Sequence, residues 1–138
     1  MKVTFWKDEA KQQIDPTLFS VHAEKLARDL AEDNANSKKV NKRTQIRKFY
    51  DEVVRLEGEA KTQQWEHVLP MIHMMVAKAA YARGRDLVSD GFVEFIRTSV
   101  DQVSTSAGNE AAGKGALKVF ANFFEAFMGF YRLHGPNN

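Results

Sequence analysis

The amino-acid sequence predicts an all-α fold, a single-domain bundle of about five helices. Apolar residues recur at three- and four-residue spacing along most of the chain, and no alternating apolar–polar segment is long enough for a useful strand. There is no internal repeat and no linker long enough to divide the 138 residues. With 43% hydrophobic and 28% charged residues, the composition is that of a globular protein. Residues 1–138 are therefore expected to form one helical domain.

The first predicted helix begins at Asp15 and Pro16, where a capping residue is followed by a proline at the first helical position. It ends near Asn34. Its apolar side consists of Phe19, Ala23, Leu26, Ala27 and Leu30. Residues 1–14 are expected to be a flexible lead-in, and residues 35–43 a basic linker.

Two further helices are predicted in the middle of the chain, from about Thr44 to Gly58 and from Trp65 to about Arg83. The inward residues of the first are Ile46, Phe49, Tyr50, Val53 and Leu56. The second has a stripe of Trp65, Val68, Leu69, Ile72, Val76 and Ala79, widened by Met71, Met74 and Met75. A helix that is apolar nearly all round is typical of the middle of a bundle or of a surface beneath a partner. Because an interior proline costs about 3 kcal/mol, Pro70 must lie in the first turn or kink this helix.

Two helices follow toward the C-terminus. The serine and aspartate at 89–90 can cap a helix whose apolar spacing reaches Val103. The small, glycine-rich residues 104–115 predict a loop or a frayed helix start. The last helix keeps its apolar spacing for four turns over residues 117–131, and the Gly-Pro pair at 135–136 ends it.

The residue inventory argues against an enzyme. The chain has no cysteine, which excludes disulfides, thiolate chemistry and cysteine-ligated zinc. The four histidines, none of which pairs at metal-binding spacing, are His22, His67, His73 and His134. Glu125 lies between phenylalanines, and we interpret it as a partner in a helix–helix salt bridge because no base or nucleophile accompanies it. No catalytic residue, metal or cofactor is expected.

One segment imitates a nucleotide-binding motif. Residues 108–115 match the phosphate-binding pattern GxxxxGK[ST] except at the end, where Gly115 replaces the hydroxyl that should hold magnesium. The residues before it have helical rather than strand periodicity, so the context of the motif is also wrong. A nucleotide hydrolase that uses Lys114 is therefore a distant alternative.

The sequence also predicts a cytoplasmic protein. The most apolar run, Val68–Ala82, contains one charged residue and falls short of the ~20 residues that span a bilayer. Asp8 and Glu9 interrupt the N-terminus too early for a secretory signal.

Positive charge is concentrated in one window. Of the 20 basic residues, six lie between positions 38 and 48 with no acid among them, which leaves 14 basic against 18 acidic residues elsewhere. The six are Lys38, Lys39, Lys42, Arg43, Arg47 and Lys48. A cation at a helix N-terminus opposes the helix dipole at ~0.3–1 kcal/mol, so helix stability does not explain them. A bound anion, shared by the side chains and the free backbone N–H groups, would explain why these cations are gathered there.

The helical wheel supports this interpretation, because an inward apolar side turns Thr44, Arg47 and Lys48 outward. Nucleic-acid phosphate is the obvious anion, since rows of Lys and Arg gain affinity by releasing counterions. Arg83 and Arg85 follow the apolar helix, where the dipole stabilises them, and they would form a second cationic row only close to the first.

Several short stretches resemble one protein family. TQIRKFY at 44–50 resembles the [ST]-Q-[IL]-R-K-[FLY] signature of the small subunit of type III-A CRISPR interference (Csm) complexes. AYARGR at 80–85, FFEAF at 123–127 and YRLHG at 131–135 agree with the same family in order and separation. The resemblance covers about residues 40–135.

The resemblance implies a non-catalytic helical protein present in several copies in an antiviral ribonucleoprotein complex. Such subunits lie beside the backbone subunits, in a complex that also contains a large subunit, and contact the phosphate backbone of guide RNA and target RNA without reading sequence. The motif positions that become expected RNA contacts are Thr44, Gln45, Arg47, Lys48, Arg83 and Arg85. The charge pattern adds Lys38, Lys39, Lys42 and Arg43.

The main alternative is a helical interaction or oligomerisation module without direct RNA binding. In that case the apolar helix docks a protein partner, which can be a second copy of the chain, and the charges only solvate the surface. The relative position of the two groups of cations distinguishes the hypotheses. One continuous basic face supports RNA binding, and opposite sides argue against it.

Overall fold

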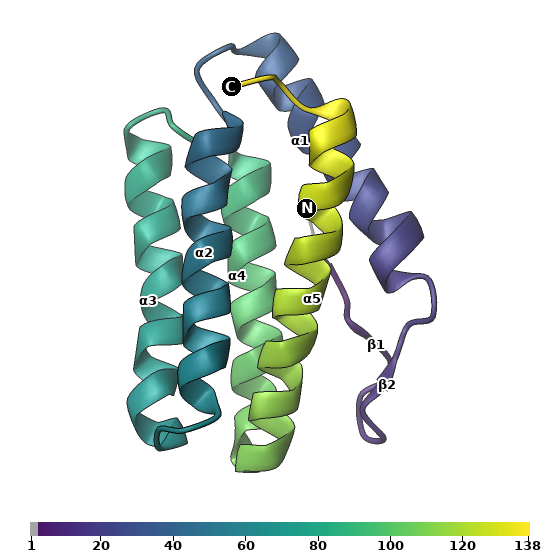
Figure 1. Ribbon diagram of the computed structural model, residues 1–138, viewed down its shortest axis with the longest axis vertical. Helices are drawn as coiled ribbons and strands as arrows, with labels where there is room; N and C mark the ends of the chain where they lie inside the picture. The colour runs from purple at the N-terminus through teal and green to yellow at the C-terminus, as the bar shows by residue number, and fades with distance from the viewer. Residues whose placement is uncertain (1–2) are drawn as a thin grey trace.

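A computed structural model describes residues 3–138 and confirms the all-α prediction (Figure 1). The helices are α1 (Ala23–Asn36), α2 (Arg43–Ala60), α3 (Trp65–Gly84), α4 (Asp90–Thr105) and α5 (Glu110–His134). A small antiparallel hairpin of β1 (Trp6–Asp8) and β2 (Gln13–Ile14) precedes them. None of the helices in residues 3–138 is both long and apolar enough to cross a membrane.

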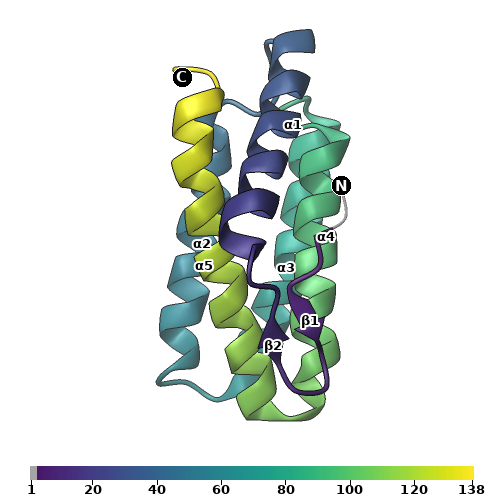
Figure 2. The same cartoon turned by 90° about the vertical axis from the view of Figure 1, so that its right-hand side faces the viewer.

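Helices α2, α3, α4 and α5 run alongside one another, and α1 lies against α5 with a smaller contact to α4 (Figures 1 and 2). Helix α3 packs on α2 and α4, so it lies at the side of the bundle rather than in its middle. Its buried stripe includes Met75 in place of the predicted Val76, and Met71 and Met74 are 40% and 48% exposed. Of the two predicted positions for this helix, the middle of the bundle is wrong, because its outer face is open to solvent, and a surface beneath a partner stays a prediction.

Proline 70 is the sixth residue of α3, so it lies beyond the first turn. The helix continues through it to Gly84, close to the predicted end. Since proline has no N–H, the carbonyl of Glu66 one turn earlier lacks its usual intrahelical donor.

The core is built largely from the phenylalanines of α4 and α5. Those with no solvent exposure are Phe92, Phe95, Phe120, Phe123, Phe124 and Phe127. Their rings contact one another at centroid distances such as 5.1 Å between Phe95 and Phe124, in an edge-to-face arrangement. Burying such a side chain stabilises the fold by ~1.5–3 kcal/mol, and edge-to-face pairs add to this. The 3–4 spacing of aromatics on α5 is therefore what fixes the bundle.

The N-terminal boundary of α1 differs from the prediction. The Asp15 carboxylate accepts hydrogen bonds from the backbone N–H and hydroxyl of Thr17, both at 2.9 Å, and closes a turn instead of starting the helix. A π-helical turn, Leu18–His22, then leads into α1. Its wider turn changes the helical register. Leu18 is consequently buried, while the predicted core residue Phe19 is 38% exposed.

Two other boundaries lie a few residues from their predicted positions. Helix α2 continues past Gly58 to Ala60. Helix α5 begins at Glu110, so residues 110–115 are helical rather than a loop, and Asn109 caps them by accepting the Ala112 N–H at 3.3 Å. The Ser89 cap of α4 is confirmed, since its hydroxyl accepts the Phe92 N–H at 3.4 Å.

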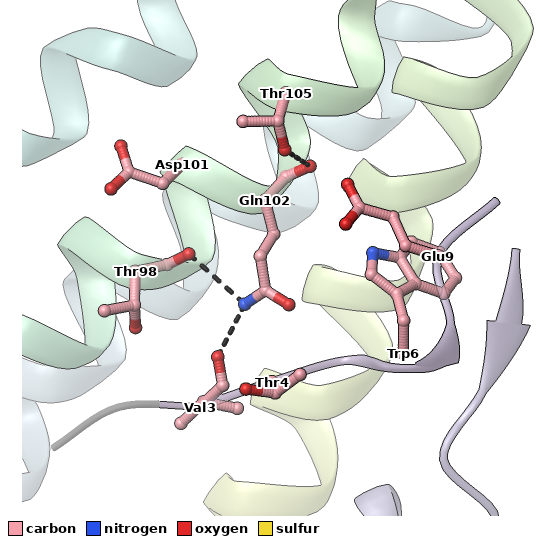
Figure 3. Close-up of a pocket in the computed structure, with 8 residues that line it drawn as sticks. All are labelled: Val3, Thr4, Trp6, Glu9, Thr98, Asp101, Gln102 and Thr105. Atoms are coloured by element: carbon pink, nitrogen blue, oxygen red, sulfur yellow. Dashed lines mark hydrogen bonds between the residues drawn. The ribbon is translucent and has the colours of Figure 1, made fainter.

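The hairpin and the residues before it dock on α4 (Figure 3). The Phe5 N–H donates to the Gln102 amide oxygen at 2.7 Å, and the Gln102 amide nitrogen donates to the Val3 carbonyl at 2.6 Å. The Phe5 side chain is fully buried. Residues 1 and 2 of the predicted lead-in lie outside the described residues, and the flexibility of residues 1–14 stays a prediction.

Candidate nucleic-acid interface

The basic linker between α1 and α2 is anchored by one buried residue, Asn41. Its amide nitrogen donates to the Leu30 carbonyl at 3.2 Å and to the Ser89 hydroxyl at 2.9 Å, and its amide oxygen accepts the Ser89 N–H at 2.9 Å. The Tyr131 hydroxyl donates to the Asn41 carbonyl at 2.5 Å. The φ of Asn41 is 60°, a left-handed conformation that asparagine tolerates better than most residues. These bonds fix the point at which α2 begins.

Sequence reasoning missed Asn41, because the surrounding lysines indicated a solvated linker. The available signal was an asparagine next to a valine between two helices, since asparagine is suited to a left-handed turn.

The Tyr131 hydroxyl that bonds the linker stays protonated. Burial of this hydroxyl raises the pKa of Tyr131, so the phenol remains a donor to the linker at ordinary pH.

The first turns of α2 are oriented as predicted. Ile46 and Phe49 face the core, with exposures of 0% and 7%. The outward residues are Thr44, Arg47 and Lys48, while Arg43 and Gln45 are partly buried on the flanks. Of the six cations in this window, Arg43, Arg47 and Lys48 are on α2, and Arg47 and Lys48 are exposed to solvent.

A groove between α2 and α3, which we call the α2–α3 groove, brings together one cation from each of the two predicted groups, Lys48 and Arg85. It is lined by Gln45, Lys48, Phe49, Glu52, Met75, Lys78, Tyr81, Ala82, Arg85 and Leu87. Lys48 and Arg85 come from opposite walls, and among the described residues neither has a carboxylate partner. The lining carries three cations and one carboxylate, so the groove is positive.

The one carboxylate of this groove is already engaged. Glu52 accepts hydrogen bonds from Arg55 at 2.8 Å and from Lys78 at 2.7 Å. These partners, Arg55 foremost, lower the pKa of Glu52 although burial opposes the shift. Glu52 thus ties α2 to α3 and does not neutralise Lys48 or Arg85.

A second depression, the α2–α5 groove, lies along the other flank of α2. It is lined by Arg43, Thr44, Arg47, Tyr50, Met128, Gly129, Arg132, Asn137 and Asn138. Arg132 was not singled out by sequence reasoning, since only the packing of α5 on α2 brings it near Arg47. Arg47 faces Asp51 at 3.9 Å, but both side chains are about two-thirds exposed and the pair is weak.

The contact of Glu125 differs from the prediction. Its side chain is exposed and accepts a long hydrogen bond from the Tyr50 hydroxyl at 3.5 Å. Burial, followed by the nearby Glu125 charge, raises the pKa of Tyr50. Among the described residues this contact between α2 and α5 takes the place of the predicted salt bridge.

The N-terminus of α2 is occupied by the chain itself. The Thr44 N–H and hydroxyl donate to the Asn138 carbonyl oxygen at 3.3 and 3.4 Å, and the Arg43 guanidinium donates to the Asn137 carbonyl at 2.8 Å. The Thr44 N–H is therefore not free to bind an external anion, contrary to the prediction of an anion shared with free backbone N–H groups. Anion binding along α2 has to come from side chains.

Arg83 and Arg85, expected to act as one row, are separated. Arg83 pairs with Asp90 at 2.6 Å and Asp86 at 3.3 Å on a surface that also includes Asp33. These carboxylates, Asp90 foremost, raise the pKa of Arg83 and offset its charge. Only Arg85 faces the α2–α3 groove. Lys38, Lys39 and Lys42 are exposed on the linker and line neither groove.

The interpretation as a nucleotide loop is wrong. The motif follows helix α4 rather than a strand, and its residues 110–115 lie within α5 with Gly113 buried. The Lys114 ammonium lies 3.7 Å from the Glu110 carboxylate on the same helix. Within residues 3–138, no cluster of three or more His, Asp or Glu side chains could hold a metal ion.

A comparison of the sequence with known protein families finds a match. Residues 15–137 match the family described as Csm2 Type III-A. The chain belongs to this family. It is thus a small subunit of a type III-A CRISPR effector complex, an assembly organised around guide RNA. The comparisons with curated proteins and with solved structures found no match.

The Csm2 match includes every cation that lines the two grooves and leaves out the hairpin. The motif residues that resemble the family therefore divide into two kinds in this Csm2 chain. Ile46, Phe49 and Phe124 hold the core, whereas Arg47, Lys48 and Arg85 are available at the surface.

Proposed function

We propose that this Csm2 subunit binds the phosphate backbone of guide and target RNA through the cationic side of α2, in the cytoplasm, without catalysing a reaction or reading sequence. The observation that carries the proposal is the meeting of Lys48 and Arg85 across the α2–α3 groove. Arg43, Arg47 and Arg132 line the α2–α5 groove on the other side of α2. Cations therefore lie on both flanks of this helix.

The chemistry of these grooves suits phosphate rather than base edges. Guanidinium groups bind phosphate oxygens in pairs, and ammonium groups bind them as point charges. Each contact releases a condensed counterion, so affinity comes from charge and is independent of sequence. The exposed Lys38, Lys39 and Lys42 extend the positive potential beyond the start of α2.

Charge reversal tests the proposal against a matched control. The triple variant Arg43→Glu, Arg47→Glu, Lys48→Glu alters the two grooves. The control, Lys7→Glu, Lys25→Glu, Arg97→Glu, makes the same change in net charge on β1, α1 and α4, away from both. We expect the first to weaken binding of two unrelated single-stranded RNAs equally, by about tenfold or more, and the second to have a much smaller effect. Equal losses in the two triples would mean that only net charge matters, and the proposal would fail.

Assembly with the other subunits and with further copies of Csm2 is a separate part of the proposal. Met71 and Met74 are large, exposed apolar side chains on the outer face of α3, which suits a protein contact. If binding to the backbone or large subunits survives RNase and the charge-reversal triple but is lost in Met71→Glu, Met74→Glu, the interaction role is independent of RNA. If the free protein forms a dimer, the same double variant tests whether that face makes it.

A further inference from the structure

The α2–α3 groove contains the most exposed tyrosine described in the structure. The side chain of Tyr81 is 67% exposed, although it lies beside the buried Met75 and Ala82 at the groove floor. The Arg85 guanidinium carbon lies 5.7 Å from the centroid of the Tyr81 ring, within the range of a cation–π contact. The Arg85 guanidinium thus lies over one face of the Tyr81 ring, one helical turn along the chain, and the unpaired Lys48 lines the same groove.

We propose that Tyr81 and Arg85 form a stacking platform for an unpaired nucleobase. The inference rests on the proposed function, because the strand that supplies the base is the RNA whose phosphates bind the groove. Nucleobases stack on tyrosine rings and on guanidinium planes, and such stacking tolerates any base. The platform therefore adds affinity without adding sequence specificity.

The rest of the groove matches the parts of a nucleotide. Lys48 on the α2 wall is placed for a phosphate, and Gln45 presents an amide that can both donate and accept. The buried ring of Phe49 and the Leu87 side chain supply an apolar floor. A hollow of about 390 Å³ lies within the ~300–1,000 Å³ of small-ligand sites, enough for a base and its ribose.

Charge favours RNA over a protein partner as the occupant. Tyrosine and arginine are also frequent at protein interfaces. Here, however, Lys48, Lys78 and Arg85 face a single carboxylate, Glu52, which is bonded to Lys78 and Arg55. The groove thus selects an anionic ligand with a flat aromatic part, and a nucleotide combines the two.

The test compares tyrosine variants on RNA with and without bases. The full-length protein, with Tyr81→Ala or Tyr81→Phe, is titrated into labelled single-stranded RNA and into the same strand carrying abasic ribose. Leu133→Ala is the matched control, because Leu133 is 72% exposed on α5 and lines neither groove. Circular dichroism and thermal melting confirm that each variant is folded.

We expect Tyr81→Ala to weaken binding of base-containing RNA about fivefold or more, the lower end of what one stacked base contributes. Tyr81→Phe keeps the stacking face and should stay within about twofold of the wild type, as should Leu133→Ala. On abasic RNA, Tyr81→Ala should bind as well as the wild type. Equal weakening on both RNAs, or none on either, would overturn the platform.

The charge-reversal triple separates this inference from the proposed function. If reversal weakens RNA binding and Tyr81→Ala does not, the backbone site is correct and the platform is not. If neither affects RNA, both are wrong. If Tyr81→Ala leaves RNA affinity intact but prevents incorporation into the effector complex, the groove is a protein interface and the platform is refuted.

Discussion

Replacing Asn41 tests whether the basic linker is anchored rather than merely solvated. Asn41 is fully buried, and its side chain makes three hydrogen bonds, two of them with Ser89. In Asn41→Ala the Ser89 N–H loses its acceptor and the Leu30 carbonyl loses a donor. An unsatisfied buried polar group costs ~1–3 kcal/mol. The left-handed φ of 60° adds ~1–2 kcal/mol for alanine, which lacks the short polar side chain that lets asparagine adopt this conformation.

The expected loss of unfolding free energy is therefore about 2–5 kcal/mol for Asn41→Ala. Asn41→Gly loses the same side-chain bonds but adopts a φ of 60° without strain. Glycine should consequently be the less damaging substitution, by about 1 kcal/mol. This order is the reverse of the usual one, in which glycine is the poorer residue because it gains entropy in the unfolded chain.

Urea denaturation measures both variants, with equal slopes taken as evidence of a two-state comparison. Asn122→Ala on the exposed side of α5 is the control and should stay within about 0.5 kcal/mol of the wild type. The reasoning is refuted if alanine at 41 is as stable as glycine, or if both variants match the control.

Three further predictions concern Glu52, Gly58 and Gly135. The pKa of Glu52 is lowered from 4.5 in the folded state, so its contribution to stability is present above pH 4.5 and disappears as the pH falls below it. The melting temperature of the wild type should therefore fall more steeply than that of Glu52→Gln as the pH is lowered through this range. Parallel falls would contradict a stabilising role of the ionised Glu52 carboxylate. Gly58→Ala should stabilise the fold by ~0.5 kcal/mol, because its Cβ meets nothing within 4 Å. In Gly135→Ala the Cβ would lie 2.7 Å from the Tyr131 carbonyl oxygen and 2.9 Å from its ring, so a loss of ~1–3 kcal/mol is expected in urea denaturation. If the two alanine variants are equally stable, the packing argument at Tyr131 is wrong.

The helices could be predicted because apolar spacing is a local property. The aromatic stripe of α5 and the burial of Ile46 and Phe49 both follow from 3–4 periodicity. The start of α1 could not be predicted in this way, since the π-helical turn at 18–22 shifts the helical register and buries Leu18 instead of Phe19. For the glycine-rich start of α5 the sequence predicts a loop or a frayed helix start, because intrinsic helix propensity there is low, whereas packing makes residues 110–115 helical.

The candidate site was only partly predictable, because charge pairing is a property of the folded chain. The outward face of α2 followed from the wheel. That Arg85 faces Lys48 while Arg83 pairs with Asp86 and Asp90 depends on how α3 ends against α4. Two residues apart on a helix, the arginines point in different directions. Arg132 and Asn41 owe their positions to contacts more than 80 residues apart in sequence.

The salt dependence of RNA binding tests the central claim most directly, because it counts phosphate contacts. For three or four contacts to single-stranded RNA, the slope of log affinity against log salt should be about −2 to −3. In the triple variant Arg43→Glu, Arg47→Glu, Lys48→Glu the slope should fall toward zero on every RNA sequence, while the control triple keeps the wild-type value. An unchanged slope in the first triple would show that the cationic side of α2 is not the RNA-binding surface.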